Sequence, residues 1–120
     1  MTVGAFLRCL PDAQDWTAGE DFGSEDEVLL RKNCARILHR YLQKVMGVRD
    51  ATTELPSYEE VRDIYDCRIC APHISQVLAR GIMETFPRGN LQLFEGNREV
   101  HEEEASLYIS RILNGWQKEI

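Results

Sequence analysis

Apolar residues recur at helical spacing in two similar segments of the chain, residues 30–42 and 101–113. The shared apolar positions are 37, 38 and 42 in the first segment and 108, 109 and 113 in the second. Spacing of three and four residues is typical of one face of an amphipathic helix. The pattern therefore predicts one kind of amphipathic helix used twice, with both copies packed into a single hydrophobic core.

The N-terminal part predicts a short helix followed by a packed loop. Thr2 is a suitable N-cap, and Pro11 marks the end of the helix, whose apolar face carries Val3, Phe6, Leu7 and Leu10. The loop 11–23 contains Trp16 and Phe22. Because large aromatic side chains gain free energy from burial, we expect this loop to lie against the core.

A long helix is predicted from Ser24 to Gly47. Ser24 and Glu27 have the spacing of a capping box, and Gly47 suits the left-handed stop of a helix. The buried stripe expected for this helix is Leu30, Cys34, Ile37, Leu38, Tyr41, Leu42 and Val45.

The sequence of the second half of the chain predicts three more helices. A second capping box at 57–60 begins a helix with Val61, Ile64 and Tyr65 inward, and Pro72 begins a shorter one that ends at Gly81. Residues 86–90 are expected to form a turn, 91–94 a short extended piece and 95–97 a second turn. The last helix is expected over about 101–114, with Gly115 as its stop and Ala105, Tyr108, Ile109, Ile112 and Trp116 as its buried stripe.

These elements predict an all-α fold, a small helical domain of about five helices. It would be built from two degenerate helix-loop-helix repeats, with a short extended segment near residues 91–94. A chain of 120 residues fits one compact domain. We therefore expect a single helical domain over 1–120, with a first half-repeat at about 2–47 and a second repeat at about 57–116.

The order of short helix, Gly-Ile turn, aromatic-Pro-x-Gly loop and long helix resembles the S-layer homology (SLH) repeat, a helical module of bacterial cell-surface proteins. The resembling residues are His73 to Met83, Phe86 to Leu91 and Glu104 to Leu113, and Leu30 to Leu42 in the first half. The resemblance implies an SLH-like helical repeat that binds cell-wall polysaccharide.

The family carries a Thr-Arg-x-Glu signature whose arginine is implicated in gripping an anionic polysaccharide. Arg31 keeps the arginine in the first copy, and Glu104 keeps the glutamate in the second. The resemblance thus implies Arg31 and Glu104 as ligand-binding residues. The copies depart from the signature where Leu30 replaces the threonine and Glu102 stands at the arginine position.

The charge of the chain limits its partners. A formal net charge of −6 and a pI near 5.0 would repel a phosphate backbone, so nucleic acid is not an expected partner. No run approaches the roughly 18 apolar residues of a membrane span, and residues 1–10 do not form a secretion signal. We therefore expect no membrane insertion and a cytoplasmic location for the chain as given, or the cell surface if it is a fragment of an exported protein.

The four cysteines, Cys9, Cys34, Cys67 and Cys70, are expected to be free thiols because a core of this size has little need of disulfides. Cys67 and Cys70 have the Cys-x-x-Cys spacing of a zinc or redox motif, and His73 could add a third ligand. A closed zinc site needs a fourth ligand, which the spacing does not supply. We expect no metal and no cofactor, with Ile69 and Cys70 packed inward between two helices.

No catalytic constellation is visible. His39, His73 and His101 have no serine or cysteine in evident partnership, so each is expected to be a surface or half-buried histidine. A phosphate-binding glycine loop, a nucleophile elbow and a paired-histidine zinc helix are also missing from the sequence. The chain is therefore not expected to be an enzyme.

The leading hypothesis is a non-catalytic binding module that presents an acidic, aromatic-bordered surface to cell-wall polysaccharide or to a protein partner. One alternative is a small acidic cytosolic protein-binding partner, such as an inhibitor or immunity-type protein, which the net charge of −6 favours. Another alternative is a metal or thiol site at Cys67 and Cys70.

Overall fold

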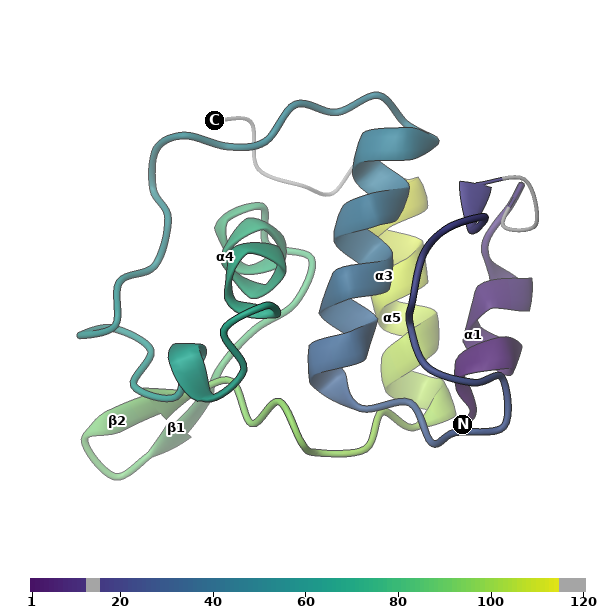
Figure 1. Cartoon of the computed structure of the whole chain (residues 1–120). Coiled ribbons are helices and arrows are strands. Elements are labelled where there is room, and N and C mark those ends of the chain that lie inside the picture. Colours follow the sequence, from purple (N-terminus) through teal and green to yellow (C-terminus); the bar gives the residue numbers. More distant parts are fainter. Residues whose placement is uncertain (13–15, 115–120) are drawn as a thin grey trace.

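The computed structural model describes residues 1–12 and 16–114, which form a mixed helix and sheet domain. Figure 1 shows α1, α3 and α5 together on one side, with α4, the 3₁₀ helix η1 and a β-hairpin on the other. The elements are α1 (Val3–Cys9), α3 (Arg31–Lys44), η1 (Ile64–Asp66), α4 (Ala71–Ala79), β1 (Phe86–Arg88), β2 (Leu91–Leu93) and α5 (Glu102–Leu113). The expected all-α domain of about five helices in two helix-loop-helix repeats is wrong, because the described residues hold four α-helices and a two-stranded antiparallel sheet.

The hairpin replaces a predicted turn. β1 pairs with β2 in the register Arg88 with Leu91, so only Gly89 and Asn90 connect the strands. Gly89 has a φ of 62°, which glycine adopts without strain and which suits the first central position of a tight hairpin turn. The extended piece expected at 91–94 is confirmed over 91–93, whereas residues 86–88 form a strand and not a turn.

Helix α3 begins at Arg31 and not at Ser24, so the predicted capping box is wrong. The backbone of residues 27–32 pairs with residues 1–3 on one side and with residues 96–100 on the other. These hydrogen bonds hold residues 28–30 extended, and the helix begins at Arg31, whose N–H still donates to the Arg98 carbonyl. Ser24 and Glu27 form an isolated turn, while the stop at Gly47, with a φ of 65°, is as predicted.

The helix predicted from Ser57 is also wrong, since that region contains turns and then the single-turn helix η1. The Ser57 hydroxyl still accepts from the backbone N–H of Glu60, so the local cap forms without a helix behind it. The Asp63 carboxylate accepts from the backbone N–H groups of Phe94 and Glu95 at 2.7 and 2.8 Å. These tertiary bonds tie the segment to the end of β2 and override its helical pattern.

The remaining helices agree with the sequence. Thr2 caps α1 by accepting from the N–H of Ala5, α4 has Pro72 in its first turn, and the chain turns at Gly81 with a φ of 75°. Helix α5 starts where expected. The predicted Gly115 stop and the burial of Trp116 lie outside the described residues.

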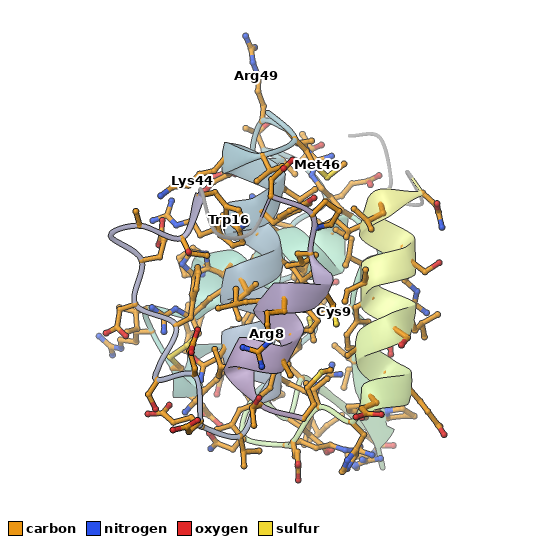
Figure 2. All side chains as sticks on the ribbon, turned by 90° about the vertical axis from the view of Figure 1, so that its right-hand side faces the viewer. Arg8, Cys9, Trp16, Lys44, Met46 and Arg49 are labelled. Atoms are coloured by element: carbon orange, nitrogen blue, oxygen red, sulfur yellow. A yellow bond between two sulfur atoms is a disulfide. The ribbon has the colours of Figure 1, made fainter. Side chains whose placement is uncertain are left out.

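One hydrophobic core joins residues from α1, α3, η1, α4 and α5. Ile37, Leu38 and Tyr108 are buried in it, and Ile109 is partly buried against it. The two predicted amphipathic segments therefore share a core. Trp16 and Phe22 are buried as expected, and the Trp16 ring lies 5.7 Å from the Tyr41 ring, beside the C-terminal part of α3 (Figure 2).

None of the helices within residues 1–12 and 16–114 combines the length and the apolar run of a membrane span.

Candidate functional site

Exposed apolar and aromatic side chains gather around η1 and the start of α4. Ile69 is 72% exposed, Tyr65 58% and Tyr58 49%. Among the other large apolar side chains of the described residues, only Val28 equals Tyr58 in exposure, and none exceeds it. Tyr65 and Ile69 were predicted to face inward, and both predictions are wrong. We call the group Tyr58, Tyr65, Arg68, Ile69 and Pro72 the η1–α4 surface.

The tyrosines form a stacked pair on this surface. The rings of Tyr58 and Tyr65 are 6.1 Å apart with an interplanar angle of 28°, and the Arg62 guanidinium lies 5.5 Å from the centre of the Tyr58 ring. Stacking limits the motion of both rings, so this surface loses less entropy when a ligand binds. The stacked tyrosine pair is therefore preorganised for binding.

A hollow of about 520 Å³ opens beside the tyrosines and is lined by Tyr65, Arg68, Ala71, Pro72 and Ser75. Its walls come from two elements, η1 with the turn after it on one side and the first turns of α4 on the other. Such a volume accommodates one or two side chains of a partner. Aromatic residues and arginine around an apolar hollow are the groups that dominate binding energy at protein interfaces.

The surface rests on buried anchors. Val61 and Ile64 are 4% and 2% exposed, and they fix the segment that carries the tyrosines into the core. Backbone bonds from Cys70 and Ala71 to the carbonyl of Cys67, at 3.1 and 3.0 Å, hold the turn that presents Ile69. The exposure of Ile69 is therefore a property of an ordered turn.

Arg31, a predicted ligand-binding residue, lies in the core with 0% exposure. Its Nε donates to the Phe94 carbonyl at 2.8 Å, one Nη donates to the Tyr108 hydroxyl at 2.6 Å, and the other donates to the Glu84 carbonyl. The guanidinium also lies 4.6 Å from the ring centres of Phe86 and Phe94. All three nitrogens of Arg31 thus have internal partners.

Glu104, the other predicted ligand-binding residue, caps helix α5. Its carboxylate accepts from the backbone N–H of His101 at 3.2 Å, as a glutamate in the first turn of a helix often does. The structure therefore gives Arg31 and Glu104 internal contacts, and neither belongs to the η1–α4 surface.

Cys67 and Cys70 form a disulfide, so the expectation of four free thiols is wrong for this pair. Cys70 is buried and Ile69 is not, which corrects half of the predicted inward packing. Cys9 and Cys34 are free, and burial raises the pKa of the Cys34 thiol. In the described residues no group of three or more His, Cys, Asp or Glu side chains is arranged to hold a metal ion, and His73 contacts His39 instead.

A chain of three titratable groups lies between α3 and α4, and the sequence did not reveal it. His39 Nε2 lies 2.7 Å from the Asp50 carboxylate, and His39 Nδ1 lies 2.8 Å from His73 Nδ1. An ionised carboxylate only accepts, so the neutral network has His39 Nε2–H donating to Asp50 and His73 Nδ1–H donating to His39. His39 is 4% exposed, so the prediction that it is a surface or half-buried histidine is wrong.

The environment lowers the pKa of two of these groups, which keeps His73 neutral and Asp50 ionised. Burial lowers the pKa of His73 to about 4, and positive charge on His39, Arg40 and Arg36 acts in the same direction, against Glu20. Burial tends to raise the pKa of Asp50, but hydrogen bonds from His39 and Gln43 outweigh it and hold that pKa below its usual value. The network thus favours a neutral His73 facing an ionised Asp50.

Comparison of the chain with protein-family models, curated proteins and solved structures yields no match. The SLH and helical-repeat assignment receives no support from these comparisons or from the mixed fold.

Proposed function

We propose that this chain is a protein-binding module whose η1–α4 surface docks a protein partner. The observation that carries the proposal is the turn at 67–70, which holds Ile69 in solvent directly after Arg68, and Arg68 lines the hollow of about 520 Å³ together with Tyr65 of the stacked pair. Exposing an isoleucine on an ordered turn forgoes its burial, worth about 2 kcal/mol. A partner that covers it would recover this free energy.

The surface favours a protein over a polysaccharide. Tyr58 and Tyr65 stack on each other with ring centres 6.1 Å apart, so each ring presents part of its surface to the other and not to a sugar. The arginine that the SLH resemblance assigned to an anionic sugar, Arg31, is buried and hydrogen-bonded within the core. Exposed isoleucine and proline, combined with tyrosine and arginine, match the chemistry of protein interfaces.

The partner should carry a basic rim. In the segment 58–68 the exposed acidic residues Glu59, Glu60 and Asp66 outnumber the exposed arginines Arg62 and Arg68, and the chain as a whole has a net charge of −6. Charge complementarity accelerates association and excludes acidic competitors. A basic protein with an apolar side chain for the hollow meets both requirements, which supports the inhibitor or immunity type of binding partner.

The test compares Ile69→Asp with a matched control, Leu107→Asp, in which an exposed leucine of α5 receives the same charge. The tagged wild-type chain is purified from its native host, the retained protein is identified, and its affinity for each variant is measured by calorimetry. We expect Ile69→Asp to weaken binding about 10- to 100-fold, or about 1.4–2.8 kcal/mol, because it places a carboxylate in the apolar contact. Leu107→Asp should bind as the wild type does.

Equal affinity of the wild type and Ile69→Asp would contradict the proposed surface, and so would a larger loss in Leu107→Asp. Repeating the titration at higher salt tests the role of charge separately, because the affinity should fall as ionic strength screens the acidic rim.

A further inference from the structure

The disulfide between Cys67 and Cys70 lies at the N-terminal end of helix α4, a position that suits a redox-active cysteine pair. A purely structural disulfide at this position would add little stability. It joins residues three apart, so it closes a very short loop. In the chain-entropy model a bond across so few residues restricts the unfolded chain less than one across a long loop. The turn has independent support, since the Cys67 carbonyl accepts from the backbone N–H groups of both Cys70 and Ala71.

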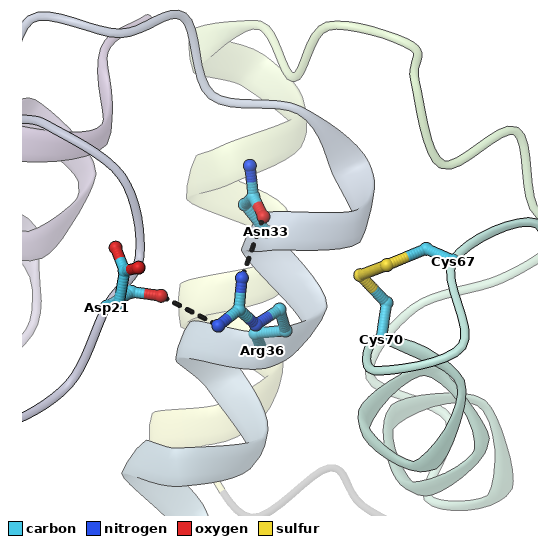
Figure 3. The surroundings of a disulfide bond; sticks show 5 residues. All are labelled: Asp21, Asn33, Arg36, Cys67 and Cys70. Carbon is cyan, nitrogen blue, oxygen red and sulfur yellow. Dashed lines mark hydrogen bonds between the residues drawn. A yellow bond between two sulfur atoms is a disulfide. The ribbon is translucent and has the colours of Figure 1, made fainter.

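The two sulfur atoms occupy different environments. Cys70 is the N-cap residue of the nine-residue helix α4 and is 1% exposed. Cys67 precedes the helix, is only partly buried and lines a small cavity of about 40 Å³ with Lys32 and Asp66. Figure 3 shows the bond running from Cys67 in the turn before α4 to Cys70 at the N-terminal end of the helix. An incoming thiolate can therefore reach Cys67 more readily than Cys70.

The helix favours Cys70 as the leaving group. The N-terminus of an α-helix carries partial positive charge from its unpaired N–H groups, which stabilises negative charge on a sulfur placed there. A sulfur that bears negative charge more easily leaves faster in thiol–disulfide exchange. Accessibility and leaving-group stability thus select the same direction of attack.

We propose that Cys67 and Cys70 form a reversible redox site that exchanges electrons with a dithiol, with Cys67 as the attacked sulfur and Cys70 as the leaving thiolate. This inference does not depend on the proposed binding function.

The reaction balances in two steps. A thiolate of the dithiol attacks Cys67 Sγ, a new S–S bond joins the dithiol to Cys67, and the bond to Cys70 breaks to release its thiolate. The second thiolate of the dithiol then attacks the dithiol sulfur that is bonded to Cys67. This closes the dithiol into a disulfide and releases the Cys67 thiolate. Two electrons pass to the protein, and the two protons of the dithiol reach Cys67 and Cys70 through solvent.

The other two cysteines do not compete. Cys34 is fully buried and burial raises its pKa, so it contributes little thiolate. Cys9 is exposed on α1 (Figure 2), and a Cys9→Ser background removes its signal from a thiol assay.

The experiment uses the Cys9→Ser protein under native conditions, treated with dithiothreitol, quenched with acid and alkylated before mass spectrometry. We expect the folded protein to gain two alkylated thiols on reduction, to lose them when the dithiothreitol is removed and oxidised glutathione is added, and to keep its circular dichroism spectrum throughout. Reduction that requires urea, or that abolishes the spectrum, would show a structural bond and overturn the proposal. Two reactive thiols before any reduction would overturn it as well.

Single variants in the same background test the order of attack. Cys70→Ser leaves the Cys67 thiol, which should form a mixed disulfide with oxidised glutathione at least about tenfold faster than Cys70 does in Cys67→Ser, because Cys70 is buried. Equal rates, or a faster reaction of Cys70, would contradict the assigned roles. If one of these variants does not fold, the reduction of the Cys9→Ser protein with dithiothreitol still tests the proposal.

Discussion

Replacing Arg31 with alanine is expected to lower the free energy of unfolding by about 4 kcal/mol. The change leaves the carbonyls of Phe94 and Glu84 and the hydroxyl of Tyr108 without their donor. A buried polar group that loses its partner costs about 1–3 kcal/mol, and removing so large a buried side chain adds a cavity cost. Urea denaturation monitored by circular dichroism measures the loss.

Arg36→Ala is the matched control on the same helix. Arg36 is partly exposed, and its guanidinium donates to the side chain of Asn33 and to the backbone of Asp21, as Figure 3 shows. Such partly solvated contacts contribute little, so we expect a loss below about 1 kcal/mol. If Arg31→Ala were as stable as Arg36→Ala, Arg31 would not be the core residue that the structure describes.

Acidification from pH 7 to pH 4 is expected to remove about 3 kcal/mol of stability through His73 alone. Burial lowers the pKa of His73 in the folded protein from 6.5 to about 4. The unfolded chain therefore binds a proton first as the pH falls, and the folded state loses stability between pH 6.5 and pH 4. Each pKa unit of difference corresponds to about 1.4 kcal/mol.

The variant His73→Asn isolates this effect, because asparagine can donate to His39 in the same way but does not titrate. The groups that face His73 are His39, Arg36 and Arg40 of α3 and Glu20 of the loop, with Asp50 behind His39. The lowered pKa of Asp50 and of Glu20 contributes stability that is lost only as the pH falls through and below the ordinary carboxyl range. Parallel pH profiles for the variant and the wild type would refute the role of His73.

Local sequence signals predicted the elements that depend on local interactions. Thr2 before α1, Pro72 in α4 and the acidic first turn of α5 act within a few residues of the helices they start. The start of α3 and the segment after Ser57 failed because distant backbone partners decide them. Residues 96–100 hold the chain extended before Arg31, and Asp63 is bound by the N–H groups that follow β2.

The functional surfaces were harder to predict for the same reason. Helical periodicity placed Tyr65 inward, and Ile69 was expected to pack inward between two helices, but the absence of a regular helix before α4 turns both outward. His39, Asp50 and His73 are far apart in sequence, so only the packing of α3 against α4 brings them together. Arg31 was predicted to bind a ligand, but it is buried in the core, and its aromatic neighbours come from β1, α5 and the residue after β2.

The most direct test of the proposed binding surface is hydrogen–deuterium exchange of the chain alone and in complex with the protein that it retains from its host. The account predicts added protection concentrated in residues 58–75, which include the stacked tyrosines and Ile69. Protection concentrated in α5, around Leu107, with residues 58–75 unchanged would contradict it.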